Sequence, residues 1–338
     1  MLIALDAMGG DYAPDEPCRG AVIACRKKPD LSVALIGDSE KIKPIVEKAE
    51  AAVRSRLHIV HTDEVITGSD SPSISIRRKK RSSLVTAFEM VRTKEADGIV
   101  SAGNTGAIAA GAVLLLGRIP GIDRPGLGAL LPVLNRTTLL MDVGGTVHCK
   151  PINLFQFAQM GTIYMKIFCD AENPSVRLLC NGEETIKGDE TISAARELIE
   201  KSSMNYQGYA EGKDIPAGVS DVVICDGFTG NILIKFGEGI GELLNSQFRE
   251  EYTNHTLPKI GLFFMWPAMK RVMGRFDWEK KGGSPVLGVN GSVVKVHGRS
   301  KAGAISYAIT GAANFIEQNG VGRIREEIEI AAETHSHS

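Results

Sequence analysis

Five stretches of the sequence share one design, in which a short apolar run ends at a glycine-rich corner carrying Asn, Thr, Asp or Lys. The corners lie at residues 98–106, 139–150, 178–188, 222–231 and 293–298. Backbone N–H groups, glycine and lysine suit the binding of phosphate and similar anions. In open α/β sheets, ligands bind where the carboxyl ends of strands converge. The corners therefore predict one shared anion pocket, and the chain is interpreted as an enzyme.

The corner around Asn104 and Thr105 leads directly into an Ala- and Leu-rich helical pattern. A helix start presents unpaired N–H groups and the positive end of the helix dipole to an anion. A plain N-cap by Asn104 or Thr105 is the alternative. The corner that ends at Asn231 repeats the arrangement. The residues predicted to bind phosphate or substrate are Asn104, Thr105, Gly106, Asp142, Lys150, Asn181, Asp226 and Thr229.

Lys187, His297 and Asn231 are the candidate catalytic residues. A lysine just beyond a strand end can supply a compact positive charge to phosphate, and both Lys150 and Lys187 hold such positions. Either could equally be a surface lysine. His297 follows a β-branched run and precedes Gly298, which makes it the candidate general acid; a structural histidine is the alternative. One shared cleft would bring Asn104, Lys187, Asp226 and Asn231 together.

Composition narrows the class of protein. The 338 residues contain 39 Lys and Arg against 40 Asp and Glu, and 43% of them are hydrophobic. This balance is typical of a soluble globular protein and argues against a nucleic-acid binder. The six cysteines form no CxxC pair and no metal-ligand spacing, so neither a metal nor a cofactor is predicted. The N-terminus turns polar after five residues, unlike a signal peptide, and a cytoplasmic protein is expected.

Strand-like and helical patterns alternate along the chain, which predicts a layered α/β/α fold with a mostly parallel sheet. A chain of this length exceeds one ordinary core, so residues 1–330 are expected to form one catalytic unit of two intimate subdomains. The charged tail at 331–338 is expected to be frayed. Predicted strands are 2–5, 31–36, 57–60, 98–101, 138–141, 176–180, 221–225 and 293–296. Predicted helices are 16–27, 39–52, 84–94, 105–116, 153–168, 190–202 and 231–251.

Residues 252–281 are expected to form a protruding amphipathic arm. Within it, residues 259–281 hold six basic and two acidic side chains, a local net charge of +4, together with both tryptophans. Leu262 and Met265 follow helical spacing, and Pro267 is expected to divide the segment into two short helices. Such a segment, with Leu262, Met265 and Trp266 as contacts, suits an anionic membrane surface. A subunit interface or core helix pair uses similar residues, and both interpretations remain open.

A second basic run contains Arg77, Arg78, Lys79 and Lys80. Runs of charge are usually solvated surfaces. Beside an anion pocket, such a run also fits an acidic partner protein.

Taken together, these motifs resemble the phosphate acyltransferase family of bacterial phospholipid synthesis, over nearly the whole chain. The matching segments are residues 6–14, 101–107, 117–125, 226–231, 282–291 and 297–298. Two departures stand out. Thr146 and His148 occupy positions where the family usually has Asn and Asp, and Tyr12 stands where His is common.

The resemblance implies that acyl-[acyl carrier protein] and orthophosphate react to give acyl phosphate and free carrier protein. It also implies a homodimer with an isocitrate/isopropylmalate-dehydrogenase-like fold, peripheral membrane association, and a membrane glycerol-3-phosphate acyltransferase that uses the product. The chemistry fits the candidate residues. Phosphate is already anionic, so attack on a thioester needs positioning and charge stabilisation more than a strong base. A thiolate also leaves with little help from a proton.

Three alternatives differ in what they would require. A phosphotransacetylase acting on short acyl-CoA would have no use for the basic run or the amphipathic segment. A nicotinamide-dependent decarboxylating dehydrogenase would need clustered metal-binding acids, which the sequence does not show. A non-catalytic membrane scaffold that binds acyl carrier protein would not need so many polar corners.

Overall fold

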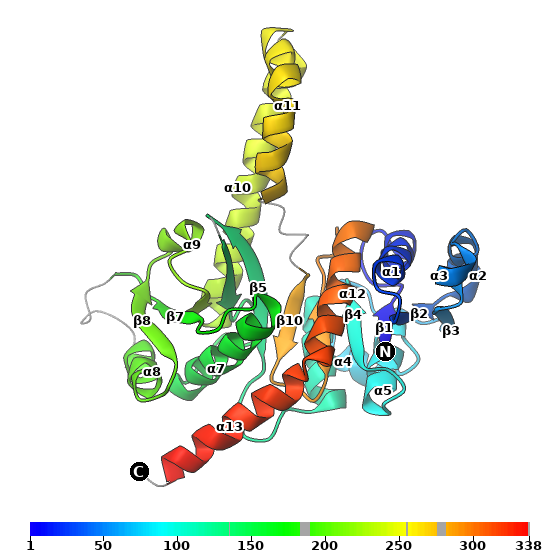
Figure 1. Cartoon of the computed structure of the whole chain (residues 1–338). Coiled ribbons are helices and arrows are strands. Elements are labelled where there is room, and N and C mark those ends of the chain that lie inside the picture. The colour runs from blue at the N-terminus through cyan, green and yellow to red at the C-terminus, as the bar shows by residue number, and fades with distance from the viewer. Residues whose placement is uncertain (135, 183–189, 255, 276–281, 337–338) are drawn as a thin grey trace.

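The computed structural model has layers of helices on both faces of an eleven-stranded sheet (Figure 1). It describes all residues except 135, 183–189, 255, 276–281 and 337–338. The strands are β1 (Leu2–Asp6), β2 (Ser32–Gly37), β3 (Leu57–His61), β4 (Gly98–Ser101), β5 (Gly126–Val133), β6 (Arg136–Met141), β7 (Ser175–Leu179), β8 (Asn205–Ala210), β9 (Val222–Ile224), β10 (Ser284–Leu287) and β11 (Ser292–Lys295). Their order across the sheet is β3-β2-β1-β4-β11-β10-β5-β6-β9-β7-β8. The prediction of an α/β fold with a mostly parallel sheet is confirmed.

The helices connect these strands and pack on the sheet. They are α1 (Asp15–Lys27), α2 (Ser39–Val46), α3 (Ala51–Arg54), α4 (Pro72–Arg78), α5 (Ser83–Arg92), α6 (Thr105–Gly111), α7 (Pro151–Phe168), α8 (Glu190–Glu200), α9 (Asp214–Ala217), α10 (Gly227–Asn254), α11 (Thr256–Arg275), α12 (Ala302–Glu317) and α13 (Gly320–Ser336). A π-helical turn, η1 (Ala112–Leu116), extends α6.

The middle of the sheet reverses the direction of the strands. β1, β2, β3, β4 and β11 are parallel to one another, as are β6, β7, β8 and β9. The pairs β11–β10, β10–β5 and β5–β6 are all antiparallel, so the two groups run in opposite directions. β1, β4 and β11 therefore end at one edge of the sheet, here called the first edge. β6, β7 and β9 end at the opposite edge, the second edge.

Side chains alternate between the two faces of the sheet, so neighbouring residues enter different cores. Ile99 and Val223 pack with Phe88 of α5 and Leu233 of α10 in one cluster. Val100 instead joins the cluster formed with α1 and α12. The face that carries α5, α6 and the start of α10 is called the α10 face.

Helix α10 connects the two edges and then leaves the sheet. It begins at the second edge directly after β9 and crosses the α10 face. At the first edge, Glu238 and Glu242 meet His297 and Arg299. Figure 1 shows α10 and α11 extending together away from the sheet. In the part of the chain that is described, no helix is both long and apolar enough to cross a membrane.

Several elements differ from the expectations drawn from sequence. β5, β8 and β10 were not predicted. Helix α11 continues through Pro267, contrary to the predicted division into two short helices. A proline removes one backbone hydrogen bond of a helix, and α11 contacts α10 over only part of its length. Helix α13 extends through residues 331–336, where a frayed tail was expected.

The start of α10 packs so closely on the loop after β6 that we expect Gly230 to be required there. A Cβ at Gly230 would overlap the backbone carbonyl oxygen of Asp142, whereas a Cβ at Gly237 on the same helix would meet nothing within 4 Å. Gly230→Ala should lower the free energy of unfolding by about 1–3 kcal/mol or more through overpacking. Gly237→Ala should be neutral or stabilising by up to about 1 kcal/mol. Urea unfolding at one protein concentration tests this, and equal effects of the two variants would contradict it.

Candidate functional site

Asp142 organises the loop that follows β6 at the second edge. Its side chain is fully buried. Oδ1 accepts hydrogen bonds from the backbone N–H groups of Leu127, Gly144 and Gly145, at 3.0, 3.2 and 2.9 Å, and Oδ2 accepts one from Thr146. Burial raises the pKa of Asp142, and these backbone donors oppose the shift. The carboxylate thus folds the loop around itself.

Asp226 has a similar function at the start of α10. Its Oδ1 accepts hydrogen bonds from the backbone N–H groups of Phe228 and Thr229, both at 2.9 Å. Its Oδ2 accepts one from the Thr229 hydroxyl at 2.6 Å. The N–H of Gly227 donates to the carbonyl of Thr146 at 2.8 Å, which joins this corner to the Asp142 loop. The two corners therefore form one structural unit.

Asn231 lies on the first turn of α10, beside this unit. A Cβ at Gly144 would lie 4.0 Å from the Cβ and Cγ of Asn231, so the side chain faces the loop of Asp142. Asn231 makes no side-chain hydrogen bond within the described part of the protein. Unlike Asp142 and Asp226, it can bind a ligand without breaking the fold.

Two further candidates lie at the same edge. Lys150 is the exposed N-cap residue of α7. The hydrogen bond from Asn153 lowers the pKa of Asp123, and the charge of Lys150 adds to that shift. Asn181 follows β7, and its Oδ1 accepts a 3.6 Å hydrogen bond from the thiol of Cys180. Lys187 lies outside the described residues, six positions beyond Asn181. The second edge thus combines the starts of two long helices with a lysine and two amides, which suits an anion.

Two cysteines of this edge, Cys149 and Cys225, are poor nucleophiles. Burial, with the nearby Asp142 and Asp226 carboxylates, raises the pKa of Cys149 to about 12. Burial also raises the pKa of Cys225 well above its usual value. Because the thiolate is the reactive form, neither thiol is activated.

Asn104, Thr105, Gly106 and His297 lie at the other, first edge. The expectation that all five polar corners converge on one edge is therefore wrong, because the sheet reverses between β11 and β6. Asn104 caps α6, its Oδ1 accepting from the N–H of Ala107 at 3.1 Å. Its Nδ2 donates to three carbonyls of the loop at residues 67–70, each at 3.3 Å. The simpler capping role describes Asn104 in this structure.

Thr105 and Gly106 start α6 and are partly buried. A Cβ at Gly106 would lie 2.6 Å from Cγ of Pro72, so α4 and α6 pack closely there. The structure thus gives Gly106 a packing role.

His297 links the first edge to α10. Its Nε2 lies 4.0 Å from Oε1 of Glu238, and its Nδ1 accepts a hydrogen bond from the N–H of Arg299 at 3.2 Å. Burial and the charges of Lys295 and Arg299 lower the pKa of His297, while Glu238 and Asp11 raise it. The ring therefore favours the neutral form, with its proton on Nε2.

The residues of the basic run differ in whether they already have partners within the protein. Lys79 is held by the fold, since its ammonium lies 2.7 Å from Asp70 and donates to the carbonyl of Val65 at 2.9 Å. Arg77, Arg78 and Lys80 are exposed at the end of α4.

The arm exposes large apolar side chains. Phe263, Phe264, Met265 and Trp266 of α11 are 77%, 76%, 58% and 51% exposed, while Leu262 is partly buried. Such a cluster marks an interaction surface.

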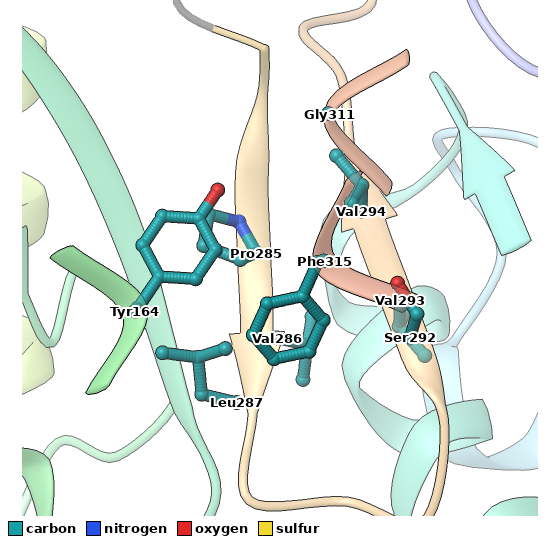
Figure 2. A pocket seen from close by; sticks show the side chains of 9 residues that line it. All are labelled: Tyr164, Pro285, Val286, Leu287, Ser292, Val293, Val294, Gly311 and Phe315. Atoms are coloured by element: carbon teal, nitrogen blue, oxygen red, sulfur yellow. The ribbon is translucent and has the colours of Figure 1, made fainter. Parts of the chain in front are cut away.

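A small apolar cavity lies on the face opposite α10, between α7, α12 and the β10–β11 pair (Figure 2). Tyr164, Leu287 and Phe315 are among the residues that line it. Its volume is about 10 Å³, which is room for at most one water molecule. It contains none of the candidate site residues, so it is a packing gap. The described residues also contain no group of three or more His, Cys, Asp or Glu placed to hold a metal ion.

Comparison with known proteins supplies the family. Residues 1–323 match the family model described as "Fatty acid synthesis protein". The phosphate acyltransferase of Thermoanaerobacter pseudethanolicus is 42% identical over 329 residues, covering 97% of this chain and 98% of that protein. The phosphate acyltransferase of Heliobacterium modesticaldum is 43% identical over 328 residues, covering 97% of this chain and 98% of that protein.

Solved structures with a similar fold are more distant. A phosphotransacetylase from Streptococcus pyogenes aligns with a TM-score of 0.63 at 18% identity, covering 94% of both chains. The EutD phosphotransacetylase from Staphylococcus aureus aligns with a TM-score of 0.59 at 14% identity, covering 93% of this chain and 94% of that one. These likenesses concern the fold. The matches along nearly the whole sequence go further: the chain belongs to the phosphate acyltransferase family and is an acyltransferase of fatty acid and phospholipid synthesis.

Proposed function

We propose that the protein transfers the acyl group of acyl-[acyl carrier protein] to orthophosphate, giving acyl phosphate and free carrier protein. A phosphate oxygen attacks the thioester carbonyl, the new C–O bond forms, the C–S bond breaks, and the sulfur leaves as thiolate. The observation that carries this proposal is the second edge. There, uncommitted Asn231 and exposed Lys150 lie where α7 and α10 begin, in a chain of the phosphate acyltransferase family.

The roles of the residues follow from charge. The N-termini of α7 and α10 and the lysines Lys150 and Lys187 attract the phosphate, and the amide of Asn231 donates to it or to the developing oxyanion. Asp142 and Asp226 hold the backbone that presents these groups. The high pKa values of Cys149 and Cys225 favour direct attack by phosphate over a thiol intermediate.

Phosphate-dependent release of free thiol from acyl carrier protein, with hydroxylamine trapping of acyl phosphate, tests the activity. Lys187→Ala and Asn231→Ala should each cost about 2–4 kcal/mol of transition-state stabilisation, the range for losing one preorganised contact. Lys48→Ala, at an exposed lysine on another part of the chain, is the matched control and should keep full activity. Activity with short acyl-CoA alone would favour a phosphotransacetylase, and thiol release independent of phosphate would refute the proposal.

We propose that the exposed basic residues at the end of α4 receive the acidic carrier protein. Arg77→Glu combined with Arg78→Glu should raise the KM for acyl-[acyl carrier protein] with little change in kcat, because rim charges act mainly on association. The effect should shrink at high salt. Lys43→Glu combined with Lys48→Glu, both at exposed positions away from α4, changes the net charge by the same amount and is the control. An unchanged KM would place the carrier elsewhere.

We propose further that the arm brings the enzyme to an anionic membrane surface, where a membrane glycerol-3-phosphate acyltransferase would use the lipophilic product. The exposed aromatic and Met cluster of α11 would enter the headgroup region, and nearby Lys and Arg would each add about 1 kcal/mol to the free energy of membrane binding.

We propose a homodimer from a separate surface. It is the exposed apolar row Phe228, Ile232 and Phe236, which faces outward from α10.

The double variant Leu262→Glu and Met265→Glu distinguishes membrane binding from dimer formation. Sedimentation with anionic vesicles should be lost, while subunit mass in solution stays that of the parent dimer. Ile330→Glu, at an equally exposed apolar position on α13, should change neither property. A monomer or an aggregate, with no vesicle binding by the parent protein, would instead make the arm a subunit interface.

A further inference from the structure

A row of polar residues crosses the sheet on the α10 face at the first edge. In the strand registers, Asp6 of β1 pairs with Ser101 of β4, which pairs with Lys295 of β11, which pairs with Ser284 of β10. One step inside the sheet, the corresponding row is wholly apolar and consists of Ala4, Ile99, Val293, Val286 and Leu127. The core on this face therefore ends abruptly at a row that contains a lysine.

The carboxylate of this row, Asp6, has hydrogen-bond partners within the protein. Asp6 is buried, and its carboxylate accepts hydrogen bonds from the hydroxyls of Ser83 and Ser101 at 2.6 and 2.7 Å, and from the N–H of Met8 at 3.2 Å. Ser101 also accepts from the N–H of Gly103 at 3.0 Å. This part of the row is a closed hydrogen-bond network.

Lys295 is different. It is partly buried, and no carboxylate of the described residues lies within 4.0 Å of its ammonium. The charge of Glu238 on α10 acts on it from farther away. Burial lowers the pKa of Lys295, and Glu238 opposes the shift. Removing an ammonium from water without a close partner is costly, which favours binding of an anion.

The other charged groups nearby are already engaged. Arg299 lies 3.2 Å from Glu242, and the ammonium of Lys301 sits 3.2 Å from the ring centroid of Tyr12. Glu16 accepts a hydrogen bond from the N–H of Ala302 at 2.6 Å. Glu238, His297 and Asp11 also belong to this charged cluster: burial and Lys295 lower the pKa of His297, and Glu238 and Asp11 raise it.

We propose that Lys295 is the cationic centre of a second anion site, at the first edge, that binds a phosphate group of a substrate. This inference rests on the proposed function. The phosphate group belongs either to free orthophosphate or to the phosphodiester in the thiol-bearing arm of acyl carrier protein. Asn231 and Glu238 are seven residues apart on α10, about 10 Å along the helix axis. A long, flexible thioester arm could therefore reach from Lys295 to the second edge.

Steady-state kinetics with Lys295→Ala and Lys295→Arg test the proposal. Lys295→Ala should raise the KM of one phosphate-bearing substrate about tenfold or more, and Lys295→Arg should restore part of the loss. Lys301→Ala removes a lysine at the same edge and should leave both KM values unchanged. If the KM for orthophosphate alone rises, the site takes free phosphate. If the KM for acyl-[acyl carrier protein] rises, but the KM for acyl-pantetheine without a phosphate does not, the site takes the phosphodiester.

A purely structural Lys295 would give a different result. If Lys295 only holds α10 through Glu238, then Glu238→Gln should reproduce both the kinetic change and the shift in melting temperature of Lys295→Ala, and the inference would be overturned. It would also be overturned if Lys295→Ala changed neither KM more than twofold. Lys295→Met, which keeps the length of the side chain, replaces the Ala variant if that fails to fold.

The proposed acyl transfer can be wrong while the anion site at Lys295 is right. In that case the parent protein would show no phosphate-dependent thiol release. Calorimetric titration of parent and Lys295→Met proteins with orthophosphate and with phosphopantetheine then tests the site directly. Binding of either probe by the parent that weakens at least tenfold in the variant supports the site. Equal binding, or none to the parent, refutes it.

Discussion

The reversal of strand direction in the middle of the sheet is the constraint on which the arrangement of the site depends. β10 and β5 are each antiparallel to both of their neighbours, so the halves on either side present their carboxyl ends at opposite edges. Loops that resemble one another in sequence are thereby separated by the length of a strand. Only an element that crosses the sheet can connect them, and α10 does so from Asp226 to Glu238.

Two buried carboxylates hold the two edges in related ways. Asp6 is the last residue of β1 and accepts hydrogen bonds from hydroxyl and N–H donors of three segments. Asp142 follows β6 and collects four backbone N–H groups. Each carboxylate uses charge-assisted hydrogen bonds to fix glycine-containing loops that would otherwise be costly to order. Polar residues that look like ligands in the sequence are here part of the framework that leaves other groups available.

The sequence predicts the layered class and most elements, because alternation of apolar strands with amphipathic helices is a local pattern. It does not reveal the reversal. β5 contains Gly126, Gly128 and Pro132, and β10 contains Pro285, so both read as loops, and without them every strand appears parallel. The expectation that all five polar corners lie at one edge of the sheet was wrong for this reason. Lys295 was missed as a candidate because it lies within an apolar run, and only strand register places it beside Asp6 and Ser101.

The type of a residue also does not reveal whether its polar group already makes hydrogen bonds within the protein or is left to bind a ligand. Asn104 and Asn231 each stand at a strand–helix corner, and from sequence they are equivalent candidates. In the structure, the amide of Asn104 makes hydrogen bonds to the first turn of α6 and to three loop carbonyls. Asp226 caps α10 instead, so Asn231, one turn later, keeps its amide for a ligand. Catalysis by charge stabilisation needs groups that the fold holds in place but whose polar atoms are not already bonded within the protein. On that criterion we propose that Asn231, on the first turn of α10, and Lys295, on β11 within the influence of Glu238 of α10, act on substrate.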